Sequence, residues 1–120
     1  MATPQTRDLT FTILSGASLS DPQQLNGGFL EGFIMPAGWT AAALSFAVGM
    51  TETGTFYSLL DSAGNEIAFP AAALVTNTAY ALPVGALRGW PWIKFRSGLS
   101  GAGVNQVADR SLAAIVRFYA

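Results

Sequence analysis

The strongest constraint on the fold is a short stretch with a two-residue hydrophobic period. Residues 44–50 read LSFAVGM, so that Leu44, Phe46, Val48 and Met50 alternate with small residues. Alternation of this kind places every second side chain on one face of an extended strand. The stretch therefore predicts a β-strand with one buried face, and the fold has to supply a core against it.

Two more strands are predicted directly after it. Residues 55–60 form the second, and the third opens at Ile67. The DSAGN segment between them contains Asp61, Gly64 and Asn65, which are residue types that turns favour. We interpret these three residues as structural turn residues, and the three strands as an antiparallel meander.

The rest of the chain follows the same short-strand pattern, with no long helical period. Further strands are predicted at residues 9–13, 19–25, 29–35, 78–82, 92–97, 104–108 and 111–119. The last of these is apolar on both faces, which is typical of a central strand that is covered on both sides. Phe118 is expected to lie inward on it, as Phe46 is on residues 44–50.

This pattern predicts an all-β fold of about eight strands. The spacing indicates a single antiparallel β-sandwich that is jelly-roll-like, with a small barrel as the alternative. Residues 1–8 are polar with an early proline, and we expect them to form a flexible N-terminal arm. Residues 9–120 then form the sandwich domain, which is long enough for a core without metal or disulfide crosslinks.

Composition excludes several classes of function. The chain has no cysteine and no histidine, so disulfides are excluded and the commonest general base and metal ligand is missing. Its net charge is −1, and its six basic residues are scattered. A nucleic-acid or anionic-membrane partner would require a basic cluster. We therefore expect no cofactor, no metal, no nucleic acid and no membrane partner.

The low charge is itself informative. Charged residues make up 11% of the chain, against about 25% in typical soluble domains. Such a surface is either neutral and polar, rich in Ser, Thr, Asn and Gln, or partly covered by other subunits. We favour the second interpretation, so the protein is expected to be oligomeric or bound to a lattice. The two long uncharged windows, 33–51 and 67–87, are interrupted by proline and glycine and do not resemble membrane spans. The N-terminus lacks the apolar core of a signal peptide.

No catalytic constellation is present, and no catalytic residue is assigned. Asp61 and Glu66 flank the predicted turn and could form a carboxylate pair or part of a calcium site. A turn cap explains Asp61 more simply. Lys94 could serve as a base for a serine nucleophile, but an outward-facing lysine on a strand is the simpler interpretation.

The tryptophans form the candidate binding site. Trp39 and Trp90 lie at turn–strand junctions, where aromatic side chains can form a sugar-stacking platform or an interface anchor. Thr40, directly after Trp39, and Arg88, two residues before Trp90, could contribute hydrogen bonds. The alternative is that these rings close the ends of the core.

A second polar group lies toward the C-terminus. The segments KFRSG and VNQVADR place Arg96 on a strand and put Gln106 and Arg110 around the following turn. Arginine can brace a loop through bidentate bonds to the backbone or to a carboxylate such as that of Asp109. We interpret Arg96, Gln106 and Arg110 as structural.

The order of four motifs resembles small virion-associated proteins of tailed phages and prophages. These motifs are IMPAGWTAAALSF, TFYSLLDSAGNE, WIKFRSG and NQVADR, followed by an apolar last strand. The likeness covers about residues 9–118. It implies a jelly-roll or galactose-binding-like sandwich with a structural role in the virion, in head decoration or in the connection of head, neck and tail. It carries no catalytic residues.

Two functions remain open at this stage. In the first, the chain is a non-enzymatic virion structural protein that is made in the host cytoplasm and contacts other virion proteins or copies of itself. In the second, it is a carbohydrate-binding jelly-roll module that uses Trp39 or Trp90 as a stacking platform. An enzymatic function is disfavoured by the missing catalytic groups.

Overall fold

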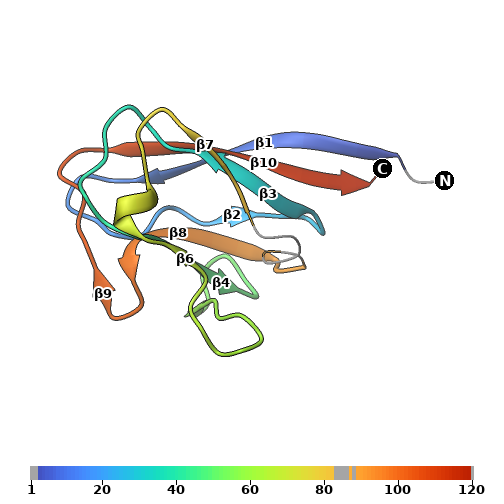
Figure 1. The fold of residues 1–120 in the computed structure, drawn as a ribbon. Coiled ribbons are helices and arrows are strands. Elements are labelled where there is room, and N and C mark those ends of the chain that lie inside the picture. Colours follow the sequence, from blue (N-terminus) through green and yellow to red (C-terminus); the bar gives the residue numbers. More distant parts are fainter. Residues whose placement is uncertain (1–2, 83–86, 88, 120) are drawn as a thin grey trace.

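The computed structural model describes residues 3–82, 87 and 89–119, and within them the chain is an antiparallel β-sandwich (Figure 1). The all-β prediction is confirmed. The strands are β1 (Pro4–Ile13), β2 (Gln23–Gln24), β3 (Phe29–Ile34), β4 (Leu44–Gly49), β5 (Phe56–Ser58), β6 (Ala68–Phe69), β7 (Ala79–Ala81), β8 (Trp92–Leu99), β9 (Ala102–Gly103) and β10 (Arg110–Tyr119). One 3-10 turn, η1 (Ala71–Ala73), precedes β7.

The first sheet has four strands in the order β1-β10-β3-β7. The last strand is central, as its sequence predicts, because it lies between β1 and β3. Its outer face is nevertheless open in the isolated chain: Ile115 is 40% exposed, whereas Leu112 and Val116 on the inner face are fully buried. The prediction that both faces are covered is therefore wrong for a single copy of this chain.

The second sheet runs in the order β2-β8-β4-β5, with β6 paired to β4 and β9 paired to β8. Every residue of β4 is buried, so the prediction of a single buried face is wrong for this strand. Phe46 and Val48 face the core, as predicted. On the outer face, the ring of Phe56 lies 3.2 Å from where a side chain on Gly49 would begin. Met50 is 68% exposed because the strand ends one residue earlier than its alternation predicts.

The predicted meander is wrong. Since β8 occupies one edge of β4, both β5 and β6 pair with the other edge, as the registers Ala47↔Ser58 and Leu44↔Phe69 show. They form one edge strand from which residues 59–67 loop out. The amide of Ile67 donates to the carbonyl of Leu59 at 3.1 Å, which closes the loop at its base. The turn therefore leads the chain onward along β4 rather than back beside β5.

The predicted N-terminal arm also needs correction. β1 begins at Pro4, and its register with β10 runs without a break from Pro4↔Tyr119 to Ile13↔Arg110. β10 is long enough to pair with residues 4–8. This polar segment therefore becomes a strand through its backbone pairing, although it has no apolar alternation of its own. Arg7 also donates to the carbonyls of Gln24 and Leu25, at 2.9 and 2.7 Å. Figure 1 shows β1 and β10 as a long ribbon, with the first residue of β1 and the last of β10 side by side.

Two other predicted strands do not form as expected. Within residues 19–25, only Gln23 and Gln24 form a strand, and Leu19 makes an isolated antiparallel bridge to Arg96. Residues 104–108 form no strand, because the backbone there makes other bonds: the amide of Gln106 donates to the carbonyl of Ala17, and its carbonyl accepts from the amide of Gly16.

The core lies between the two sheets and is built from phenylalanine and aliphatic side chains. Phe11, Phe46 and Phe95 are fully buried within it. Phe118 points to the same side of β10 as Leu112 but is only half-buried. It lies beyond Arg117, the last residue of β10 that pairs with β3, so β1 is the one strand that pairs with it in the described structure.

Candidate functional site

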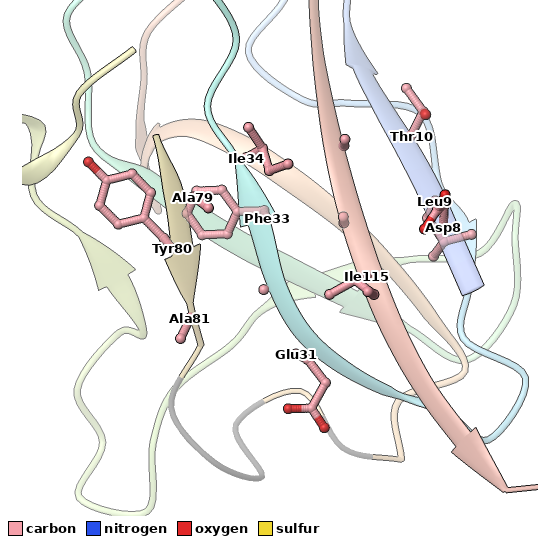
Figure 2. Close-up of a pocket in the computed structure, with 13 residues that line it drawn as sticks. Asp8, Leu9, Thr10, Glu31, Phe33, Ile34, Ala79, Tyr80, Ala81 and Ile115 are labelled. Atoms are coloured by element: carbon pink, nitrogen blue, oxygen red, sulfur yellow. The ribbon is translucent and has the colours of Figure 1, made fainter. Parts of the chain in front are cut away.

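The outer face of the four-stranded sheet carries a groove of about 560 Å³. All four strands of this sheet contribute to its lining. Figure 2 shows Ile34 on β3 and Ile115 on β10, with Ala79 and Ala81 on β7 to one side and Asp8 and Thr10 on β1 to the other. The groove is open to solvent and its lining is mostly apolar.

Strand register explains the shape of the groove. One cross-strand row runs Thr10–Ala113–Ile34–Ala79, and the next runs Asp8–Ile115–Gly32–Ala81. In each row an isoleucine lies beside alanine or glycine. Large side chains therefore alternate with positions whose side chains are small or absent. Ile34 and Ile115 are 50% and 40% exposed. These two side chains are therefore available to fill hollows in a partner.

Glycine is required in the second row. A Cβ on Gly32 would lie 2.6 Å from the carbonyl oxygen of Tyr80, a backbone atom of the neighbouring strand. Any side chain there would push β7 away from β3. Gly32 therefore allows β7 to pair with β3. Because it has no side chain, it also leaves space in the groove at this position.

Charged groups lie near the ends of the groove lining. Glu31 is the extra residue of a bulge, since Ile115 pairs with Gly32 and Val116 with Leu30. Its carboxylate lies 3.2 Å from Nε of Arg117, and both side chains are almost half exposed. Asp8 is exposed on β1. With so few polar groups, the groove is suited to apolar contact rather than to catalysis.

The sequence contains a signal for this face that our interpretation did not use. Residues 111–119 are apolar on both faces, and we took this to mean burial by the chain itself. Ile115 and Tyr119 belong to the outward-facing half of this pattern, and the fold leaves both of them exposed. Apolar residues on the outer face of a central strand therefore indicated an exposed surface here.

The two candidate tryptophans do not share a surface. The ring of Trp39 is half-buried against the core, and its Nε1 donates to the carbonyl of Ala42 at 3.1 Å. Thr40, beside it, bonds to Gln106, which in turn bonds to Ser97 near the end of β8. Trp90 is half-buried against the core two residues before β8 begins. The two rings therefore lie near opposite ends of β8, and Arg88 lies outside the described residues.

Arg96 lies in a polar network on the outer face of the second sheet. Its Nη1 is 3.1 Å from Oε2 of Glu66, and its Nη2 donates to Oγ of Ser58 at 3.2 Å. The amide of Ser100 also donates to Glu66, at 3.0 Å. The side chains of Arg96 and Glu66 are only 12% and 18% exposed. The network ties β8 to β5 and to the loop before β6. Glu66 was not among the residues that we assigned to this cluster.

Gln106 is the most buried polar side chain of the C-terminal group, at 1% exposure. Its Oε1 accepts from the amide of Thr40 at 2.8 Å and from Nε of Arg110 at 3.1 Å. Its Nε2 donates to the carbonyl of Thr40 and to Oγ of Ser97, at 3.1 and 2.8 Å. Asp109 bonds instead to the amide of Ser15. Gln106 and Arg110 thus join the loop after β3 to the ends of β8 and β10.

The residues at 61–65 form a compact turn. Oδ1 of Asp61 accepts from the amides of Ala63 and Asn65, both at 2.9 Å. Gly64 has a φ of 85°, a left-handed conformation that favours glycine. Since the carboxylate of Asp61 is occupied by backbone amides, its geometry is that of a turn cap.

The described parts of the chain hold no cluster of three acidic side chains that could bind a metal ion. Within the same residues, no helix has the length and apolar character needed to cross a membrane. The groove on the four-stranded sheet is therefore the best-defined candidate site in the described structure.

Comparison with known proteins supports the fold. No protein-family model matches the chain, and no curated protein sequence matches it. Among solved structures, the chain is similar to the SPBc2 prophage-derived protein YomS, with a TM-score of 0.59. The two are 14% identical, and the alignment covers 98% of this chain and 97% of that protein. At this identity the likeness concerns the fold alone.

Proposed function

We propose that this chain is a non-catalytic structural protein of a tailed-phage particle that acts through protein–protein contacts in the head or in the head–neck–tail connection. It is made in the host cytoplasm and resides in the virion. Its partners are other virion proteins or copies of itself, and it uses no cofactor. The fold shared end to end with a prophage-derived protein supports a phage-related role.

The observation that carries the proposal is the open apolar groove on the four-stranded sheet. Ile34 and Ile115 stand half-exposed among alanine and glycine, with charge confined to Asp8, Glu31 and Arg117 nearby. Full burial of an isoleucine side chain is worth about 1.5–3 kcal/mol, so the half left open in each is worth about 1 kcal/mol in a contact. A surface of this composition is suited to permanent contact with protein.

The carbohydrate-binding alternative loses its structural basis. A stacking platform needs accessible rings on a shared groove, with placed polar groups to orient the sugar. Trp39 and Trp90 lie near opposite ends of β8, and both pack against the core. We therefore assign neither of them to a binding site.

Particle composition tests the proposal directly. We expect mass spectrometry of purified particles, from a lysate of the host that carries the gene, to detect the chain at a constant ratio to the major capsid protein. Ile34→Asp combined with Ile115→Asp should fold and yet be absent from particles. Met50→Asp, at an exposed apolar position directly after β4 of the other sheet, is the control and should incorporate normally. Particles that lack the parent chain would overturn the proposal.

A further inference from the structure

The four-stranded sheet has one long open edge, which is the outer side of β1. Five elements lie at sheet edges in the described structure: β1, β7, β2, β9 and the β5–β6 strand. β7 has three residues, β2 and β9 have two each, and the β5–β6 strand is interrupted by residues 59–67. Short or interrupted edges are the usual protection against pairing with other chains. β1, with ten residues and an unbroken register, is the exception.

Hydrogen bonds identify which backbone groups face this edge. The amide of Thr12 donates to Oδ1 of Asp21 at 2.8 Å, and its carbonyl accepts from the amide of Asp21 at 3.1 Å. Thr12 thus points both backbone groups away from β10. Because a strand alternates with period two, Thr10, Asp8 and Thr6 point theirs the same way. Their six N–H and C=O groups have no partner among the described residues.

The side chains of residues 6–10 leave the backbone at this edge accessible to another strand. Arg7, the cation within this span, turns its guanidinium away to the carbonyls of Gln24 and Leu25. Asp8 is the one charge that remains on the outer face of the span. Thr6 and Thr10 are β-branched, and such residues favour paired strands. The edge therefore offers a row of alternating donors and acceptors, and an extended backbone is the ligand that matches it.

We infer that β1 pairs with β1 of a second copy, antiparallel and about a two-fold axis. Two identical strands in this orientation supply each other's donors and acceptors, so the edge is self-complementary without any other sequence. The result is one continuous eight-stranded sheet with the two grooves on the same side. Asp21 marks the end of the available span, because it already occupies the backbone groups of Thr12.

Removal of one edge donor tests the pairing. We expect sedimentation of the isolated chain at micromolar concentration to give twice its 12.5 kDa mass. Thr10→Pro removes an amide that points away from β10, so all β1–β10 bonds remain, and edge strands tolerate proline. This variant should be a monomer with nearly unchanged melting temperature. Thr10→Val keeps the amide and the branched side chain, and it should remain a dimer.

Crosslinking gives an independent readout if Thr10→Pro does not fold. The chain contains no cysteine, so single cysteines scanned from Thr6 to Thr10 can form disulfides only between copies. One or two positions next to the axis should crosslink under mild oxidation, and Ser62→Cys in the distant turn should not. A monomeric parent chain, or a dimer without any crosslink in the scan, overturns the proposal. Both tests use the isolated chain. Their outcome is therefore independent of whether the chain is incorporated into particles, which tests the proposed function.

Discussion

Phe11 and Phe95 stack face to face across the sandwich, with ring centroids 4.2 Å apart and planes within 10° of parallel. Phe11 comes from the four-stranded sheet and Phe95 from the other sheet. Phe95 also meets Phe46 and Phe33 edge-on, at 5.2 and 5.7 Å. Residues far apart in the chain thus meet at one ring, and packing of the two sheets depends on it.

Truncation of that ring should therefore be among the most costly core changes. Phe95→Ala is expected to lower the free energy of unfolding by about 3–5 kcal/mol, because it removes a fully buried ring and leaves a cavity. Phe118→Ala should cost clearly less, since that side chain is only half-buried at the end of β10. Urea unfolding of both variants measures the difference. Equal losses would show that the inner face is packed differently.

The Gln106 side chain is expected to contribute strongly to the stability of the fold, although it is polar. Gln106→Leu removes four hydrogen bonds and leaves the part-buried backbone groups of Thr40 and the buried hydroxyl of Ser97 without these partners. Since each unsatisfied buried group costs about 1–3 kcal/mol, we expect a total loss of about 2–4 kcal/mol. Asn105→Ala, on the exposed neighbouring residue, is the control and should change stability by less than about 0.5 kcal/mol. Thermal unfolding of the two variants decides whether Gln106 is a structural tie.

The two ion pairs of the described structure should differ in strength. Arg96 and Glu66 are mostly buried, so Arg96→Met leaves a poorly solvated carboxylate and is expected to cost about 2–3 kcal/mol. Arg117→Met should cost less than about 1 kcal/mol, because Arg117 and Glu31 are almost half exposed. A double-mutant cycle with Glu66→Gln or Glu31→Gln isolates each coupling energy. Similar couplings for both pairs would contradict the difference in burial.

Sugar binding at the tryptophans should be absent. Trp39 and Trp90 lie near opposite ends of β8, and Nε1 of Trp39 is bonded to a backbone carbonyl. Tryptophan fluorescence is therefore expected to stay constant when mono- and oligosaccharides are added at millimolar concentration. A saturable change that Trp39→Ala or Trp90→Ala abolishes would restore the carbohydrate-binding module as the better hypothesis.

Local pattern was sufficient to predict the fold class and most of the strands. Alternation at residues 44–50 and 92–97 identified β4 and β8, because the period of a strand depends only on neighbouring residues. The turn chemistry of Asp61, Gly64 and Asn65 is local in the same way. The central place of β10 followed from its apolar composition.

The remaining features of the fold depend on contacts between residues that are distant in the chain. Residues 4–8 have no strand pattern of their own and are extended only because β10 is beside them. The loop at 59–67 joins two pieces of one edge strand, and this became visible only when both were seen to pair with β4. Gln106 bonds to Thr40, 66 residues away. The open groove also depends on the tertiary structure. The sequence shows that Ile115 is apolar, but its neighbours in the fold determine that it stays exposed.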